Sequence, residues 1–177
     1  MKKKSFLIDM DGVLVNSVKS LLALHEKETG IHIKLSQITT YNIEVCTGIK
    51  GLNKYWCRPE IYKGLDLTDD AKKLVRLLNK HGVQSLSMSS ETSALKAKIL
   101  ERNGVKRFKF VDFNMVKDFD KFEYVIEDNP YVAKENYNKL FMVERPYNIG
   151  LLEDENLKYI KSMDDNRLLS IIYGLAS

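Results

Sequence analysis

The stretch Ile8–Leu14, which reads IDMDGVL, places two carboxylates directly after an apolar segment. The segment Phe6–Ile8 is typical of a short buried strand, and residues two apart on an extended chain point to the same side. Asp9 and Asp11 can therefore act on one small volume. Two anions that close raise each other's pKa unless a cation lies between them. A hard divalent cation such as Mg²⁺, which prefers oxygen ligands, meets this need, and the stretch predicts such a site.

A plain turn is the alternative interpretation of the same stretch. Asp-Gly pairs are frequent in turns, where the aspartate is a turn former and Gly12 adopts a positive φ. Apolar residues flank the carboxylates on both sides, however, since Val13 and Leu14 follow the glycine. Carboxylates held between two buried segments favour a site over a surface turn.

The rest of the chain alternates between helix-like and strand-like segments. After residue 64, the pattern predicts helices near 68–81, 95–103, 132–139 and 166–175, and strands near 83–88, 108–113, 124–126, 140–143 and 159. This alternation is typical of an α/β domain with a parallel sheet. In an open parallel sheet the carboxyl ends of the strands form the ligand crevice, so residues that follow the strands are the candidates for a site.

Two further strand ends carry polar groups of the same kind. Ser89 and Ser90 follow the second predicted strand, where serines are ordinarily N-caps of the next helix. A hydroxyl beside free backbone N–H groups at a helix start is also suited to bind phosphate. Asp128 comes just after the predicted strand at 124–126 and precedes Asn129-Pro130, a sequence that also suits a plain turn. Three strand ends with matching chemistry favour one shared site over three unrelated turns.

Residues 18–64 form an expected insertion between the first motif and the rest of the core. Their first part has the apolar spacing of a helix, which Gly30 ends. Farther on, the sequence loses periodicity and collects aromatic residues, which either form the core of the insertion or stack on a flat ligand ring. Tyr41 and Trp56 are the candidates for the second role. The sequence thus predicts a core of residues 1–17 and 65–177, with a small, mostly helical cap of residues 18–64.

The composition describes a chain with one sizeable core and a mild positive charge. Its 177 residues are 44% hydrophobic and carry a formal net charge of +4, which suits a small anionic substrate and falls short of a groove for a nucleic-acid polymer. The apolar segment after Lys2–Lys4 is too short for a signal peptide, and no apolar run is long enough to cross a membrane. Cys46 and Cys57 fit neither a disulfide framework nor a metal site, so we expect reduced thiols in a cytoplasmic protein. Whether the chain acts as a monomer or a homodimer stays open.

Taken together, these motifs resemble those of the haloacid dehalogenase (HAD) superfamily of phosphatases. DMDGVL, residues 9–14, resembles the signature DxDGV of that superfamily. Ser89, Lys117, the segment Val125–Asp128 and RPYN at 145–148 are similar in order and spacing to the 5′(3′)-deoxyribonucleotidase family, and the resemblance covers nearly the whole chain. It implies a Rossmann-like, three-layer α/β core with a helical cap, and removal of phosphate from nucleoside monophosphates with Mg²⁺.

The resemblance also implies a role for each residue. Asp9 would attack phosphorus and form an aspartyl-phosphate, and Asp11 would carry the proton of the leaving group. Asp9, Asp11 through its main-chain carbonyl, and Asp128 would hold the Mg²⁺ ion. Ser89, with Ser90 beside it, would bind the phosphate.

A lysine would neutralise the remaining charge of the phosphate. Lys117 matches the position of that lysine in the family by its spacing to Asp128, and Lys121 and Lys96 are the alternatives. Glu127 departs from the pair of aspartates that is usual at this point. Its longer side chain would not bind the metal directly but would orient a metal-bound water.

The substrate is the least determined part of the expectation. The family commonly continues its first motif with a small residue, Asp and Phe, whose ring helps to bind the base, whereas this chain has Val15–Val18. A 5′-nucleotidase for ribo- or deoxyribonucleoside monophosphates is the primary hypothesis. A phosphatase for another small phosphomonoester, such as a sugar phosphate, is the alternative within the same chemistry. A non-catalytic regulatory module that binds nucleotides is the alternative from a different class.

Overall fold

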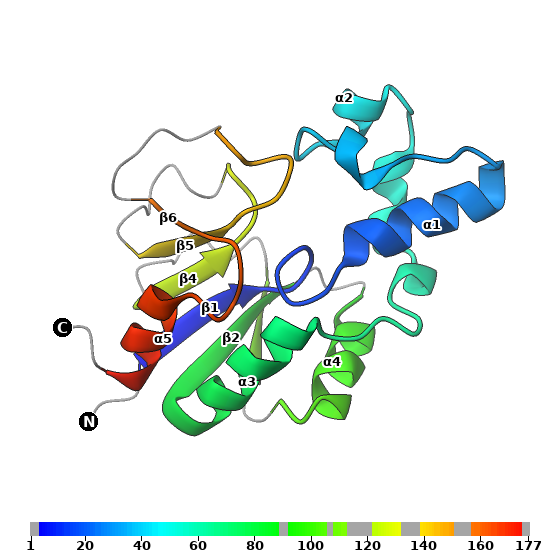
Figure 1. The fold of residues 1–177 in the computed structure, drawn as a ribbon. Coiled ribbons are helices and arrows are strands. Elements are labelled where there is room, and N and C mark those ends of the chain that lie inside the picture. Colours follow the sequence, from blue (N-terminus) through cyan, green and yellow to red (C-terminus); the bar gives the residue numbers. More distant parts are fainter. Residues whose placement is uncertain are drawn as a thin grey trace.

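The computed structural model describes residues 4–88, 92–105, 108–112, 122–131, 139–150 and 157–174. Figure 1 shows their arrangement. The strands are β1 (Lys4–Asp9), β2 (Gly82–Met88), β3 (Phe108–Asp112), β4 (Tyr124–Glu127), β5 (Leu140–Val143) and β6 (Lys158–Ile160). The α-helices are α1 (Ser17–Thr29), α2 (Ile43–Thr47), α3 (Asp69–His81), α4 (Ser93–Arg102) and α5 (Asn166–Tyr173), and short 3-10 helices are η1 (Leu35–Gln37), η2 (Leu52–Cys57) and η3 (Pro59–Ile61).

The strands form one parallel sheet with β1 near its centre. Their order in the described structure is β3-β2-β1-β4-β5-β6, and each neighbouring pair is parallel. Phe6, Leu7 and Ile8 of β1 are at most 1% exposed, as expected for a strand of a parallel sheet that is covered on both faces. The predicted α/β fold with a parallel sheet is therefore confirmed, and the strands lie where the sequence pattern predicted them.

The chain reverses its direction across the sheet beside β1. It proceeds from β1 to β2 and β3 on one side, and then continues with β4, β5 and β6 on the other. Open α/β sheets bind their ligands at such a switch point, outside the carboxyl ends of the strands. Ile8 pairs with Ile126 across β1 and β4. The residues that follow them, Asp9 and Glu127, therefore lie side by side at this edge.

The helical insertion, residues 18–64, lies beyond the carboxyl ends of β1 and β4 (Figure 1). Its first helix, α1, buries Val18, Leu21, Leu22 and His25, which is the predicted helical stripe. Gly30 ends α1 with a φ of 73°, a conformation that glycine adopts without a steric cost. The insertion is mostly helical, as predicted, because its apolar residues pack inward on short helices.

Helices α3 and α5 pack together on one face of the sheet. Ala71, Leu74, Val75 and Leu78 of α3 are at most 1% exposed, so apolar residues at helical spacing form the buried face of this predicted helix. Residues 132–138, the greater part of another predicted helix, lie outside the described residues.

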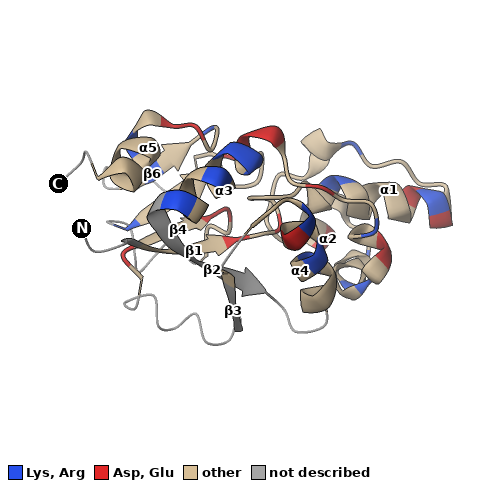
Figure 2. Ribbon diagram, turned by 90° about the horizontal axis from the view of Figure 1, so that it is seen from below, with Lys and Arg blue, Asp and Glu red and all other residues tan. Residues whose placement is uncertain are grey.

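Charged side chains are spread over several elements rather than gathered on one. In Figure 2, Lys and Arg occur on α1, α3 and α4, with Asp and Glu among them. Within the described part of the chain, no helix has both the length and the apolar character needed to span a membrane. Neither Cys46 nor Cys57 is part of a disulfide within the described residues.

Candidate active site

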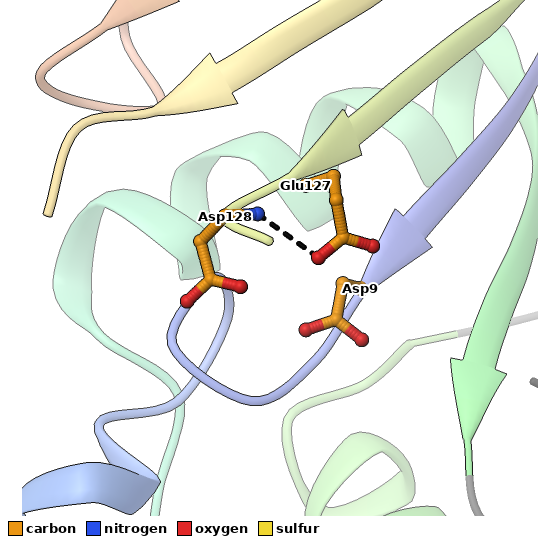
Figure 3. A group of neighbouring side chains, drawn as sticks. All are labelled: Asp9, Glu127 and Asp128. Atoms are coloured by element: carbon orange, nitrogen blue, oxygen red, sulfur yellow. Dashed lines mark hydrogen bonds between the residues drawn. The ribbon is translucent and has the colours of Figure 1, made fainter. Parts of the chain in front are cut away.

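Three carboxylates meet at the carboxyl ends of β1 and β4 (Figure 3). Asp9 ends β1, Glu127 ends β4, and Asp128 follows it. One oxygen from each of the three side chains lies within 4.8 Å of the others. Oε1 of Glu127 accepts hydrogen bonds from the backbone N–H groups of Asp128 and Asn129, both at 3.0 Å. These bonds hold the Glu127 side chain against the loop, so the cluster has a defined shape.

Burial destabilises the charged forms of all three groups, and repulsion between carboxylates adds to this effect at Asp9 and Glu127. Burial and the charges of Asp128 and Asp11 raise the pKa of Asp9 well above its ordinary value. Burial and the charges of Asp9 and Asp128 raise the pKa of Glu127 in the same way. Burial raises the pKa of Asp128 to about 6, against the effect of a hydrogen bond from Tyr147. A divalent cation among these oxygens offsets both effects, so the donor set fits Mg²⁺.

Asp11 lies beside this cluster but has different partners. Its Oδ2 contacts the ammonium group of Lys96 and accepts a hydrogen bond from the hydroxyl of Tyr62 at 3.2 Å. Lys96 comes from the first half of α4 and is only 3% exposed. Its ammonium group lies 5.1 Å from the centre of the Tyr62 ring. The structure thus places one of the three candidate lysines, Lys96, at the first motif.

The loop after β5, residues 145–148 with the sequence RPYN, holds the cluster from the other side. Nε of Arg145 donates to the main-chain oxygen of Gly12 at 2.7 Å. The hydroxyl of Tyr147 donates to Oδ2 of Asp128, and Nδ2 of Asn148 donates to the main-chain oxygen of Asp128 at 2.8 Å. This loop therefore orients Asp128 and ties it to the loop that follows β1.

Gly12 lies where the loop after β1 passes closest to Asp128. Its φ is 76°. A Cβ atom at this position would lie 1.8 Å from Oδ2 of Asp128 and 2.8 Å from the hydroxyl oxygen of Tyr147. The positive φ and the close approach both require glycine. A turn at Gly12 and a cluster of carboxylates, which the sequence offered as alternative interpretations, therefore occur together.

Tyr41 of the insertion also faces the carboxylates. Its ring makes edge-to-face contacts with Tyr147, at 5.9 Å between ring centres, and with Tyr131, at 6.0 Å. Burial and the charge of Asp128 raise the pKa of Tyr41, although 40% of the residue surface remains exposed. Trp56, the other aromatic candidate, packs against the hydrophobic core. Of the two, Tyr41 is the one that the structure brings to the cluster.

Solved hydrolase structures match this architecture over nearly its whole length. A hydrolase from Pseudomonas syringae aligns with a TM-score of 0.62 at 17% identity, over 99% of this chain and 100% of that chain. A haloacid dehalogenase-like hydrolase from Streptococcus pneumoniae aligns with a TM-score of 0.61 at 11% identity, over 98% of each chain. The HAD-hydrolase YfnB from Bacillus subtilis, solved bound to magnesium, aligns with a TM-score of 0.57 at 14% identity, over 97% of this chain and 99% of that chain.

The chain has the haloacid dehalogenase fold. At these identities the likeness is one of fold. No family model matches the sequence, and no curated protein matches it either.

Within the HAD fold of this chain, four predicted site residues come together at one edge of the sheet: Asp9, Asp11, Glu127 and Asp128. Other predicted residues lie outside the described part of the chain: Ser89, Ser90, Lys117 and Lys121. Sequence reasoning assigned no role to Tyr62, which it grouped with the aromatic residues of the insertion. It noted RPYN only as a resemblance. The local sequence around Tyr62 contains no signal for its contact, because its partner Asp11 is 51 positions away.

We expect Mg²⁺ to stabilise the protein strongly near neutral pH and weakly in acid. On folding, the pKa of Asp128 rises from its ordinary value of 3.8 to about 6. The folded, metal-free protein therefore binds this proton more tightly than the unfolded chain does, and its stability falls as the pH rises between those values. At about pH 7.5, saturating Mg²⁺ should raise the Tm by roughly 5 to 10 °C. At about pH 5, where protons compete for the carboxylates, the rise should be much smaller.

Two variants control this thermal-unfolding measurement. Asp128→Asn should lose the rise with Mg²⁺, because it removes one of the three charges. Asp69→Asn, at a side chain that is 99% exposed, should keep it. A rise of the same size at both pH values would contradict the part assigned to the buried carboxylates.

Gly12→Ala should be far more damaging than the matched change Gly30→Ala. Both glycines have a positive φ, of 76° and 73°, so both variants pay a backbone strain of about 1 to 2 kcal/mol. Only at Gly12 does the new methyl group collide with Asp128, since no atom lies within 4 Å of a Cβ at Gly30. We expect Gly12→Ala to have the lower Tm of the two and to lose the stabilisation by Mg²⁺. Equal Tm values and equal responses to Mg²⁺ would show that the close approach to Asp128 is unimportant.

Proposed function

We propose that this protein is a Mg²⁺-dependent phosphomonoester hydrolase that acts on nucleoside 5′-monophosphates. The proposal rests chiefly on one observation. Asp9 and Asp128 lie within one cluster of oxygens, and Asp11, paired with Lys96, lies beside them. This arrangement supports the proposal, because transfer of a phosphoryl group requires a nucleophile, a proton carrier and positive charge within one small volume, and Asp9, Asp11 and Lys96 are the candidates for these parts.

The reaction begins with attack of an Asp9 carboxylate oxygen on phosphorus, in line with the bond to the leaving group. The bond between phosphorus and the ester oxygen breaks, and an aspartyl-phosphate forms. Asp11 donates its proton to the departing oxygen and then takes a proton from the water that hydrolyses the aspartyl-phosphate. Free phosphate leaves, and both carboxyl groups return to their starting state.

Asp9 and Asp128, with the main-chain oxygen of Asp11, are the proposed ligands of Mg²⁺. The ion would screen the anionic nucleophile from the anionic substrate. Glu127 is proposed to orient a metal-bound water instead of binding the ion directly, because one of its oxygens already accepts two backbone N–H groups. Among the described residues, Lys96 supplies the positive charge nearest to the motif, and we propose that it contacts the phosphate. Lys117, with Lys121, is the alternative from the sequence, and Ser89 with Ser90 remains the proposed hydroxyl partner.

The choice of a nucleotide substrate rests on the insertion and on the resemblance to the 5′(3′)-deoxyribonucleotidase family. Residues 18–64 are the proposed cap over the core formed by residues 1–17 and 65–177. Tyr41, which is 40% exposed, has its ring next to that of Tyr147, whose hydroxyl donates to Asp128, and an aromatic ring suits stacking on a flat base. A sugar phosphate offers no flat ring, so this observation favours nucleotides over the sugar-phosphate alternative.

A panel of substrates tests the proposal directly. The purified protein with Mg²⁺ should release phosphate from nucleoside 5′-monophosphates faster than from sugar phosphates, and chelation of the metal should abolish the activity. Asp9→Asn should lower the rate by at least about a thousandfold, with little change in Tm, because the amide keeps the shape of the carboxylate. Faster hydrolysis of sugar phosphates would show that the substrates are sugar phosphates and not nucleotides. Release of chloride from a 2-haloacid without phosphatase activity, or binding of nucleotides without turnover, would overturn the proposed function.

Lys96→Met should lower kcat/KM by about a hundredfold, because it removes the cation expected to stabilise charge at the phosphate. Lys98→Met, two residues away on the exposed side of α4, is the matched control and should leave kcat/KM unchanged. Lys117→Met tests the alternative. If Lys117→Met is the more damaging of the two changes, the sequence spacing identified the phosphate lysine and Lys96 serves Asp11 alone.

A further inference from the structure

Tyr62 contacts the candidate proton carrier although it belongs to the insertion. It follows η3 near the end of residues 18–64, is only 3% exposed, and packs with the hydrophobic core. Its hydroxyl donates a hydrogen bond to Oδ2 of Asp11 at 3.2 Å. The proposed reaction does not use this residue. The proposed reaction therefore leaves the role of this buried hydroxyl, next to a reacting carboxyl group, unexplained.

The two oxygens of Asp11 lie in different surroundings. Oδ2 has two donors, the ammonium group of Lys96 and the hydroxyl of Tyr62. Tyr62 is held in turn from two sides, by a side-chain hydrogen bond with Thr92 and by Lys96 over its ring. Oδ1 is buried and has no hydrogen-bond partner within the described part of the chain. Among the described residues, the carboxyl group is thus anchored through Oδ2 and not through Oδ1.

This asymmetry decides which oxygen can carry a proton. An oxygen that already accepts hydrogen bonds from an ammonium group and a hydroxyl has its lone pairs engaged, so a proton there would displace a donor. The proton of a neutral Asp11 therefore belongs on Oδ1. A buried Oδ1 without a protein partner is costly unless another group pairs with it, and the ester oxygen of a bound substrate is a group that can do so.

We propose that Tyr62 is a positioning residue that, together with Lys96, holds Oδ2 of Asp11 so that Oδ1 delivers the proton to the leaving-group oxygen. The proton moves from Oδ1 to the ester oxygen while the bond between phosphorus and that oxygen breaks, and Asp11 is left as a carboxylate. The inference rests on the proposed phosphatase function. It adds that the insertion contributes to the chemical step through the Tyr62 hydroxyl, in addition to any part in binding substrate.

Two phosphate esters of nearly the same shape test this role. The leaving group of phenyl phosphate is strongly basic and needs a proton, whereas that of p-nitrophenyl phosphate is weakly basic and departs without one. Tyr62→Phe removes only the hydroxyl. We expect it to lower kcat/KM for phenyl phosphate about tenfold and kcat/KM for p-nitrophenyl phosphate less than about twofold. kcat/KM is the proper quantity, because it covers the steps up to loss of the first leaving group.

Tyr55→Phe is the matched control. Tyr55 lies in the same insertion, and its hydroxyl also donates to a carboxylate, that of Glu28 at 2.8 Å, which is not part of the site. This variant should hydrolyse both esters like the wild type. If thermal unfolding shows that Tyr62→Phe does not fold, Thr92→Val tests the same arrangement. This variant removes a hydrogen bond that orients the Tyr62 hydroxyl. It should lower kcat/KM for phenyl phosphate selectively, as expected for Tyr62→Phe.

The outcomes separate the inference from the function on which it rests. A wild-type protein without Mg²⁺-dependent activity on nucleoside 5′-monophosphates and on both esters would overturn the proposed function and the role of Tyr62 with it. An active wild type whose Tyr62→Phe variant loses equal activity on both esters would leave the function standing and overturn the positioning role. An active wild type whose Tyr62→Phe variant keeps full activity on both esters would likewise leave the function standing and overturn the positioning role. Only a loss confined to the basic leaving group supports the proposal.

Discussion

The repulsion among buried carboxylates at the ends of β1 and β4 is the constraint on which the rest of the structure depends. One oxygen each of Asp9, Glu127 and Asp128 lies within 4.8 Å of the others. Burial is the main cause that raises the pKa of all three groups, and the charges of neighbouring carboxylates add to it at Asp9 and Glu127. A fold does not keep such a cluster for its stability, because burying like charges costs free energy. The cluster fits a divalent cation, and the surrounding contacts fix the positions of its oxygens.

Those contacts come from parts of the chain that are distant in sequence. The loop at 145–148 reaches Asp128 through Tyr147 and Asn148, and reaches Gly12 through Arg145. Because Gly12 has no side chain, the loop after β1 can pass against Asp128. Contacts thus connect the turn at Gly12, the side chain of Asp128 and the RPYN loop. The effects of substitutions in these three parts on stability should therefore not be additive.

Asp11 lies beside the cluster but differs from it in its hydrogen-bond and ion-pair partners. The cluster lacks a protein cation in direct contact within the described residues, whereas Asp11 has Lys96 and a tyrosine hydroxyl on a single oxygen. Two carboxyl groups two residues apart therefore meet different surroundings, which is how one motif can supply both a nucleophile and a proton carrier. The insertion takes part in this division, because Tyr62 belongs to it.

The sequence by itself determined the strands, the helices α1, α3, α4 and α5, and the strand ends at which the candidate site lies. The apolar run before Asp9, the stripe on α3 and the alternation of helix and strand are local patterns, and local patterns are set by burial on one face or two. The same reasoning placed Asp9 and Asp128 at one edge, since parallel strands end on the same side. Only the tertiary structure decided which groups reach that edge from elsewhere. Lys96 rather than another described lysine pairs with Asp11, and Tyr62 and Tyr147 supply hydroxyls, because the packing of α4, the insertion and the RPYN loop against the sheet brings together residues separated by 19 to 85 positions. No periodicity or spacing along the chain encodes such distances.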